Sequence, residues 1–277
     1  MDVIDLTLEY PSLHGGTLTP FCLTNLTLEY PSNKRPAVIV VPGGTYISNA
    51  WREGQPVAVK FLSFGFQSFV LGYHTAADGV RYPEELLELA SAVDYLKRHA
   101  AEYFINPDEI FVVGFSAGGH LVGNLAQEMH HLDKHGFHGD ATIKAIGLSY
   151  PVINPNYGHP NSHKNLLNGY DEETKKKLMD ELSLDLHVTE ANPPAFLFGT
   201  SCDTVVPPHN IISYAEALGA KGITYELHLY PYGEHGWGSG DREFVGPFNG
   251  YPDKRANVEK WTEECATFFR DFCVEVF

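Results

Sequence analysis

The sequence predicts an α/β protein with a mostly parallel central sheet, helices on both faces and antiparallel strands at the N-terminus. Short apolar runs alternate with amphipathic stretches along most of the chain, which is typical of repeated β–α units. The apolar runs are almost continuous in Val, Ile, Leu and Phe, as expected for strands that are covered on both faces. With 277 residues, of which 43% are hydrophobic, the chain is long enough to bury one large core. We therefore expect a single domain over residues 1–277.

The first part of the chain predicts the antiparallel strands, because the segment LTLEYPS occurs at residues 6–12 and again at 26–32. Alternating Leu-Thr-Leu-Glu-Tyr followed by Pro-Ser is typical of a strand that leads into a turn. A solenoid needs about three or more repeats, so this repetition does not predict a repeat protein.

The strands that follow are predicted by apolar runs at residues 37–41, 68–72, 110–114, 145–150, 195–199 and 224–230. Helical patterns accompany these runs at residues 54–64, 83–99, 117–129, 209–218 and 257–272. The helix that starts at Pro83 repeats Leu, Ala and Val at helical spacing. It ends in Lys-Arg-His, which suits the negative end of the helix dipole.

Residues 151–194 depart from this alternation because they are rich in Asn, Pro and His. The charged run at 171–177 favours a short surface helix within this segment. We expect a small cap insertion over one end of the sheet, where it would shape a pocket. A long surface loop is the alternative interpretation.

A candidate nucleophile follows the third of the apolar runs, in the stretch IFVVGFSAGGH. Residues 114–118 read Gly-Phe-Ser-Ala-Gly and match G-x-S-x-G between a strand and a helical pattern, which is the context of a nucleophile elbow. The two glycines leave room for a tight turn that lifts the Ser116 hydroxyl out of the sheet. A phosphate-binding turn is the weaker alternative, because the stretch contains neither GK[ST] nor G-x-G-x-x-G.

A serine nucleophile needs a histidine base and a carboxylate that orients the histidine, and both are expected after later strands of the sheet. Asp203 lies in the loop after the fifth apolar run, and His235 lies in the loop after the sixth. Sheets of this class use the order Ser, Asp, His, which Ser116, Asp203 and His235 follow. Position selects His235 among 14 histidines, since His228 falls inside a strand and His209 at a helix start.

The sequence does not predict a metal site or a disulfide. His131 and His135 have i, i+4 spacing, but no HExxH pattern or acidic third ligand accompanies them. The four cysteines are too scattered for a disulfide framework and form no CxxC pair, so free thiols are expected. Cys202, beside Asp203, is interpreted as a packing residue because it is not on an elbow.

The formal net charge of −16 argues against nucleic acid or an anionic membrane as a partner, since both need clustered Lys and Arg. The first residues, MDVIDLTLEY, are acidic where a signal peptide is basic. Moreover, no apolar run approaches the ~20 residues of a membrane span. We therefore expect a cytoplasmic protein. A homodimer is also expected, because two-fold symmetric homodimers are the commonest assemblies of soluble proteins.

Five stretches together resemble the small bacterial α/β-hydrolase carboxylesterases of the acetyl-esterase and acetylxylan-esterase-like group. They lie between residues 35 and 238 and read PAVIVVPGGTY, YPEELLELASAVDYLKRHA, INPDEIFVVGFSAGGHL, NPPAFLFGTSCDTVVP and YELHLYPYGEHGWG. The resemblance implies the α/β-hydrolase fold. It also implies Ser116 as nucleophile, Asp203 as orienting acid and His235 as base.

The same resemblance implies an oxyanion hole made of backbone N–H groups. Ala117 supplies one of them, and the Pro-Gly-Gly turn supplies the others at Gly44 and Thr45. Many relatives have His-Gly-Gly-Gly at this turn, whereas this chain has Pro42 in place of the His and Thr45 in place of the last Gly. The backbone donors do not depend on those side chains. Glu88, where many relatives have Asp, is a further departure.

The activity that the resemblance implies is hydrolysis of carboxylic esters, with short acyl groups such as acetyl removed from small or sugar esters through an acyl-enzyme. No metal or organic cofactor is expected. Two alternatives stay open: a serine peptidase of the same fold that acts on short peptides, and a non-catalytic binding protein built on a hydrolase fold. The residues expected near the mouth of the substrate pocket are Gly43, Tyr46, Tyr73 and Trp237, with Trp51, Tyr157 and Phe248 as further aromatic candidates.

Overall fold

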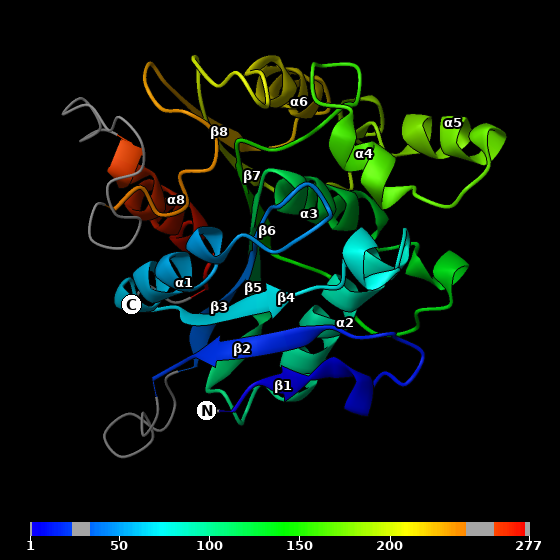
Figure 1. Ribbon diagram of the computed structural model, residues 1–277. Helices are drawn as coiled ribbons and strands as arrows, with labels where there is room; N and C mark the ends of the chain where they lie inside the picture. Colours follow the sequence, from blue (N-terminus) through cyan, green and yellow to red (C-terminus); the bar gives the residue numbers. More distant parts are fainter. Residues whose placement is uncertain (1, 24–33, 242–257, 275–277) are drawn as a thin grey trace.

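The computed structural model describes residues 2–23, 34–241 and 258–274 of the chain (Figure 1). The second LTLEYPS copy at 26–32 and Phe248 lie outside these residues, so their predicted roles stay predictions.

Within the described residues, the sheet has eight strands in the order β1-β2-β4-β3-β5-β6-β7-β8. The strands β1 and β4 pair antiparallel with β2, and the remaining neighbours pair parallel. The fold class predicted from the sequence is therefore confirmed. The bounds are β1 (Ile4–Asp5), β2 (Thr17–Phe21), β3 (Arg35–Val41), β4 (Gln67–Gly72), β5 (Ile105–Phe115), β6 (Ala145–Ser149), β7 (Ala195–Thr200) and β8 (Tyr225–Tyr230).

The first LTLEYPS copy is not a strand, so this part of the prediction was wrong. Leu6–Leu8 form a short 3₁₀ helix, η1, that begins after Asp5. The Asp5 carboxylate accepts hydrogen bonds from the amide and the hydroxyl of Thr7 at 2.9 and 2.6 Å. Such a cap satisfies a backbone donor locally and competes with strand pairing, which is why the alternating pattern misleads here.

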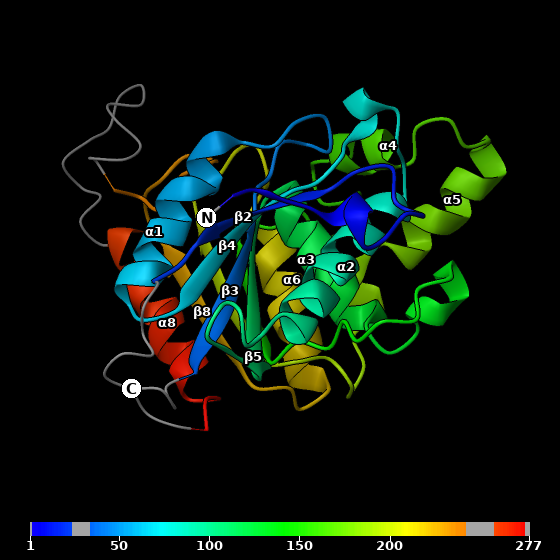
Figure 2. The same ribbon diagram turned by 90° about the horizontal axis from the view of Figure 1, so that it is seen from below.

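Helices cover both faces of the sheet, as the alternating pattern predicts (Figures 1 and 2). The helices α1 and α8 lie on one face, and α2, α3 and α6 lie on the other. Their bounds are α1 (Gln55–Ser63), α2 (Glu84–Arg98), α3 (Ala117–Glu128), α6 (His209–Ala220) and α8 (Trp261–Arg270).

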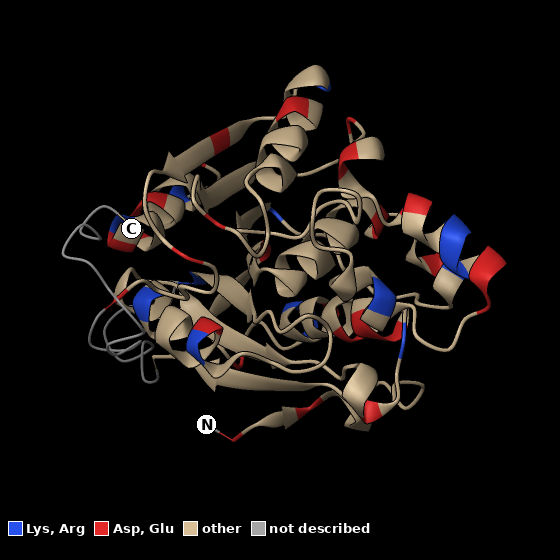
Figure 3. Ribbon diagram, turned by 45° about the horizontal axis from the view of Figure 1, so that its top comes forward, with Lys and Arg blue, Asp and Glu red and all other residues tan. Residues whose placement is uncertain are grey.

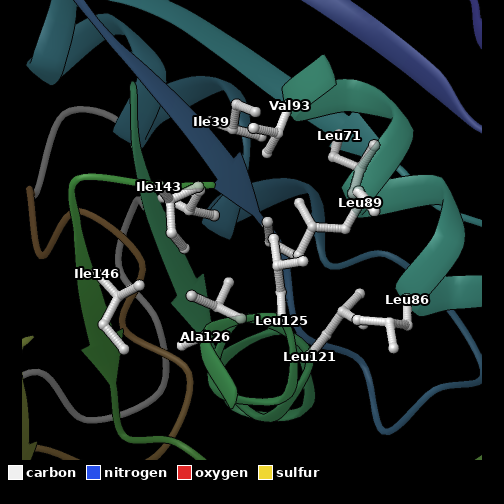
Figure 4. Packing of buried hydrophobic residues seen from close by; sticks show 14 of the residues in the cluster. Ile39, Leu71, Leu86, Leu89, Val93, Leu121, Leu125, Ala126, Ile143 and Ile146 are labelled. Atoms are coloured by element: carbon white, nitrogen blue, oxygen red, sulfur yellow. The ribbon is translucent and has the colours of Figure 1, made fainter. Parts of the chain in front are cut away.

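The strand β3 illustrates how one apolar run serves two cores. Val38 and Val40 pack into the cluster under α1 and α8, while Ile39 and its alternate neighbours pack under α2 and α3. Figure 4 shows the second cluster, in which Ile39, Leu89 and Leu125 meet from three different elements. The sheet is thus buried on both faces, which is why its strands read as almost continuous Val and Ile.

The cluster under α8 is rich in aromatic rings. Phe269 is fully buried, and its ring stacks on Phe111 of β5 at 4.6 Å between centroids. It also lies 6.1 Å from the ring of Phe61 in α1, so it links α1, α8 and the sheet. Aromatic pairs of this kind add to the free energy gained by burying the rings.

Replacing Phe269 by alanine is expected to lower the free energy of unfolding by about 3–5 kcal/mol, because it leaves a cavity among rings that cannot close over it. Urea unfolding followed by far-ultraviolet circular dichroism measures the change. Phe272→Ala is the matched control, because that ring is only partly buried at the edge of the same cluster, and its effect should be smaller. An equal loss in both variants would contradict the assignment of Phe269 to the centre of this core.

The segment between β6 and β7 carries the helices α4 (Asn161–Leu166) and α5 (Glu172–Glu181). The helix α5 buries none of its residues, and Figure 3 shows acidic and basic residues along it, away from the sheet. The helix α4 buries His163 and Leu166 against the rest of the molecule. The surface helix predicted from the charged run is present, and the action of the segment as a cap stays a prediction.

Candidate active site

Ser116 stands alone between the end of β5 and the start of α3. Its backbone has φ 52° and ψ −117°, a combination that residues with a side chain rarely adopt. The turn is held by the Ser116 N–H, which donates to the Ser149 carbonyl at 3.0 Å. The Ser116 carbonyl in turn accepts from the amides of His120 and Val152 at 3.1 and 3.0 Å.

The glycines of the G-x-S-x-G motif are required by close backbone approach. A Cβ atom on Gly114 would lie 2.4 Å from the Gly118 carbonyl oxygen, and one on Gly118 would lie 2.3 Å from the Val41 carbonyl oxygen. Both distances are far inside van der Waals contact, so the strand-to-helix turn closes only with glycine at both positions. The elbow predicted from the sequence thus has the geometry that lifts Ser116 to the carboxyl edge of the sheet.

The structure brings Ser116, His235 and Asp203 together, although they are far apart along the chain. The Ser116 Oγ lies 2.8 Å from His235 Nε2, and His235 Nδ1 lies 2.7 Å from Asp203 Oδ2. An ionised carboxylate only accepts, so Nδ1 carries the proton, and Nε2 is left to accept the serine hydroxyl. The three side chains form one line of hydrogen bonds.

The Asp203 carboxylate is fixed by its own loop. Its Oδ1 atom accepts hydrogen bonds from the amides of Val205 and Val206, both at 2.9 Å, which leaves Oδ2 facing His235. The side chain is only 2% exposed, so the hydrogen bond to His235 is shielded from water. The loop after β7 therefore presents one carboxylate oxygen in one orientation.

The Pro-Gly-Gly turn after β3 lies beside the nucleophile. A Cβ atom on Gly43 would be 2.8 Å from the Ser116 Cβ, so this glycine lets the turn approach the elbow. Gly44 has φ 135°, and Thr45 has φ 58°. No hydrogen bond within the described residues uses the amide N–H of Gly44, Thr45 or Ala117. The Gly43 N–H, in contrast, is taken by the carboxylate of Glu53 at 2.8 Å.

Three of the residues predicted to line the substrate pocket have buried side chains, and their part in the pocket stays a prediction. Tyr46 is fully buried, and its hydroxyl is 2.8 Å from His120 Nδ1. Tyr73 is 2% exposed, and its hydroxyl donates to the Pro42 carbonyl at 2.9 Å. Trp237 is 6% exposed and packs into the aromatic core under α8. Of these three residues, Tyr46 belongs to the turn itself, where it has φ 58°.

Behind the turn lies a histidine that the sequence did not single out. His120 is fully buried, and burial lowers its pKa to about 4, so the ring is neutral. Its Nε2 donates to the Leu182 carbonyl at 2.9 Å, and His163 of α4 donates to the same oxygen at 3.2 Å. A neutral ring leaves Nδ1 free to accept from Tyr46. Through the Leu182 carbonyl, the segment between β6 and β7 is hydrogen-bonded to His120 of α3. No local pattern in the sequence predicts this contact.

In residues 2–23, 34–241 and 258–274, no group of three or more His, Cys, Asp or Glu side chains is arranged to hold a metal ion. The histidines predicted to be a poor metal pair, His131 and His135, belong to no such group. The same residues contain no helix that is long and apolar enough to cross a membrane.

Residues 27–218 match the family model described as BD-FAE. This match covers more than half of the chain, including the Pro-Gly-Gly turn, the elbow and Asp203. The chain belongs to the BD-FAE family.

Two curated relatives of this BD-FAE chain are longer proteins. The Endo-1,4-beta-xylanase B of Butyrivibrio fibrisolvens is 33% identical over 225 residues, which is 78% of this chain and 35% of the relative. The Acetylxylan esterase of Xylanibacter ruminicola is 30% identical over 218 residues, which is 76% of this chain and 42% of the relative. The chain spans less than half the length of these relatives.

A solved structure confirms the fold of this BD-FAE protein. The acetyl ester-xyloside bifunctional hydrolase from Caldicellulosiruptor lactoaceticus superposes with a TM-score of 0.81 at 29% sequence identity, covering 98% of this chain and 96% of that chain. With the observed strand order, this likeness establishes the α/β-hydrolase fold that the resemblance implied.

Proposed function

We propose that this chain is a serine carboxylesterase that removes short acyl groups, acetyl above all, from small or sugar esters. The observation that carries the proposal is the line from Ser116 Oγ through His235 to Asp203, with hydrogen bonds of 2.8 and 2.7 Å. A hydroxyl on a strained elbow, an acceptor nitrogen beside it and a buried carboxylate behind that nitrogen are the three parts of nucleophilic acyl transfer.

In the first step, Ser116 Oγ bonds to the ester carbonyl carbon while its proton passes to His235 Nε2. The imidazolium that forms is stabilised by the Asp203 carboxylate 2.7 Å from Nδ1. The negative charge on the former carbonyl oxygen is held by the amide N–H groups of Ala117, Gly44 and Thr45. Each such donor contributes about 2.7–4 kcal/mol of transition-state stabilisation. The C–O bond to the alcohol then breaks, and the alcohol leaves with the proton from His235.

In the second step, water attacks the acyl-enzyme. His235 Nε2 accepts a proton from the water as its oxygen bonds to the acyl carbon, and the same amides hold the second oxyanion. The bond to Ser116 Oγ breaks, Oγ recovers the proton from His235, and the carboxylic acid is released. In both steps His235 moves the proton, and the same backbone amides hold the negative charge.

The names of similar proteins support an acetyl ester as substrate. The relative from Xylanibacter ruminicola is called an acetylxylan esterase, and the superposed structure is called an acetyl ester-xyloside hydrolase. We therefore propose acetylated xylo-oligosaccharides as the substrate class. The exposed ring of Trp51, at 67% exposure, is a candidate to stack on a sugar. Action in the cytoplasm and assembly as a homodimer stay predictions.

The proposal predicts that kcat/KM for 4-nitrophenyl acetate exceeds that for 4-nitrophenyl octanoate by at least about 10-fold, since a pocket for a short acyl chain excludes added methylenes. A fluorophosphonate probe should label Ser116, which peptide mass spectrometry locates. Acetate release from acetylated xylo-oligosaccharides tests the sugar part. Faster hydrolysis of aminoacyl 4-nitroanilides would favour the peptidase alternative, and the absence of both labelling and turnover would favour a binding protein.

A further inference from the structure

A buried glutamate lies between the two loops that the proposed reaction uses. Glu53 ends the short 3₁₀ helix η2 (Trp51–Glu53), just before α1, and is 2% exposed. An acidic residue just before a helix is ordinarily solvated, so the sequence does not distinguish it from the other acidic residues. Burial of a carboxylate is costly unless each oxygen has a donor, and its two oxygens do have donors from different parts of the chain.

One oxygen of Glu53 holds the Pro-Gly-Gly turn. The Gly43 N–H donates to Oε2 at 2.8 Å, which fixes the Pro42–Gly43 peptide plane at the start of the turn. A Cβ atom on Gly43 would lie 2.8 Å from this same oxygen, so the carboxylate and the turn are in close contact. With the Gly43 N–H taken by Glu53, the next two amides of the turn are those left to meet an oxyanion.

The other oxygen of Glu53 holds the His235 loop through Tyr150. The Tyr150 hydroxyl donates to Oε1 at 3.0 Å and accepts from the Gly238 N–H at 2.8 Å. The Tyr150 ring lies against the His235 ring, with centroids 4.9 Å apart. From the residue before Glu53, Arg52 Nε donates to the Gly236 carbonyl at 2.6 Å. The single turn η2 is thus linked to the residues that follow His235 at two points.

The burial of Glu53 changes the pKa values of this carboxyl and of the tyrosines near it. Burial raises the pKa of Glu53, and the Gly43 N–H, His235, Arg52 and the Tyr150 hydroxyl oppose that rise. Burial, together with Glu53, holds the pKa of Tyr150 well above its ordinary value, so the phenol keeps its proton and remains a donor. Burial and the nearby charge of Glu53 likewise raise the pKa of Tyr73, which follows β4.

We propose that Glu53 is a positioning residue for the esterase reaction, because it holds the Pro-Gly-Gly turn and the His235 loop in register through its two carboxylate oxygens. This inference rests on the proposed function, because it assumes that Gly44, Thr45 and His235 act on an ester. Glu53 does not touch the reacting atoms and acts through Gly43 and Tyr150.

The test compares Glu53→Gln with Glu109→Gln. The glutamine side chain keeps the shape of the glutamate but has one acceptor for two donors and no charge. Glu109 is also buried and also accepts a backbone N–H, from Val274 at 2.7 Å, but it lies in the first half of β5, whereas Ser116 follows the end of that strand. We expect Glu53→Gln to lower kcat for 4-nitrophenyl acetate about 10²-fold with KM changed by less than about threefold, and Glu109→Gln to leave both unchanged.

Two further readouts separate positioning from a merely structural role. The pKa of Glu53 is raised in the folded state, so the wild-type protein loses stability as pH rises and Glu53 ionises. Glutamine carries no charge. The melting temperature of Glu53→Gln should therefore be at least that of the wild type at neutral pH. As pH falls, wild-type Glu53 takes up a proton and comes to resemble glutamine. The ratio of wild-type to variant kcat should therefore shrink toward acid pH.

The results that would overturn the inference are a kcat within about threefold of wild type, or a loss that is the same at every pH. If Glu53→Gln does not fold, Tyr150→Phe replaces it, since it removes the link to Gly238 while leaving the carboxylate on Gly43. We expect about a 10-fold loss of kcat there, and full activity would overturn the inference. A wild-type chain without esterase activity or probe labelling would instead refute the proposed function.

Discussion

Replacing Ser116 by alanine is expected to lower kcat for 4-nitrophenyl acetate by at least about 10⁴-fold and to abolish labelling by a fluorophosphonate probe. The change removes the hydroxyl oxygen that lies 2.8 Å from His235 Nε2. Without it no acyl-enzyme forms, and the residual rate comes from the oxyanion hole and binding alone. Initial rates with purified protein, together with gel fluorescence of the probe, measure both effects.

The matched control for this prediction is Ser68→Ala. Ser68 is fully buried in β4, and its hydroxyl has no hydrogen-bond partner in the part of the chain that the structure describes. Its replacement should leave labelling and kcat unchanged. Retention of more than about 1% of the wild-type kcat by Ser116→Ala, with the protein folded, would refute Ser116 as the nucleophile.

Replacing Asp203 by asparagine is expected to lower kcat by about 10⁴-fold while the protein stays folded. The reason is specific to this loop. The Oδ1 atom accepts from the amides of Val205 and Val206, so the amide oxygen of asparagine keeps that place, and its NH₂ group faces His235. A donor there forces the proton of the ring onto Nε2, which then cannot accept the Ser116 proton.

The control for this second variant is Asp94→Asn. Asp94 is also mostly buried, but it belongs to α2, and its carboxylate accepts from Tyr10 and Arg98 rather than from a residue of the candidate site. Its replacement should alter stability and leave kcat within about twofold. If Asp203→Asn keeps kcat within about 10-fold of wild type at neutral pH, His235 does not depend on this carboxylate.

The elements that the sequence predicted correctly are those whose pattern reflects burial alone. The apolar runs that form β3, β5 and β7 have no polar face, because helices cover both sides of the sheet. The elbow was visible because its glycines are demanded by contacts within a few residues, such as Gly114 against Gly118. Asp203 and His235 followed from chain order, since the loops after parallel strands meet at one edge of the sheet.

The features that the sequence did not predict depend on side-chain direction and on local capping. Tyr46 and Tyr73 are near the nucleophile in the chain's topology, but both rings point into the core, where their hydroxyls meet His120 and the Pro42 carbonyl. The segment Leu6–Leu8 has an alternating pattern, but a single aspartate cap makes it helical. A local pattern does not report which side of a turn a ring occupies, because that depends on atoms from distant segments.

The sequence by itself determined the alternation of strands and helices from β3 to β8, the strained serine turn and the identity of the three side chains in the candidate triad. These depend on hydrophobic periodicity, on glycine and on the order of loops along the chain. Only the tertiary structure decided which amides of the turn after β3 stay free, because Glu53 takes the Gly43 N–H and reaches the His235 loop through Tyr150. That arrangement joins residues far apart in the sequence, and a buried polar group finds such partners only once the fold has brought them together.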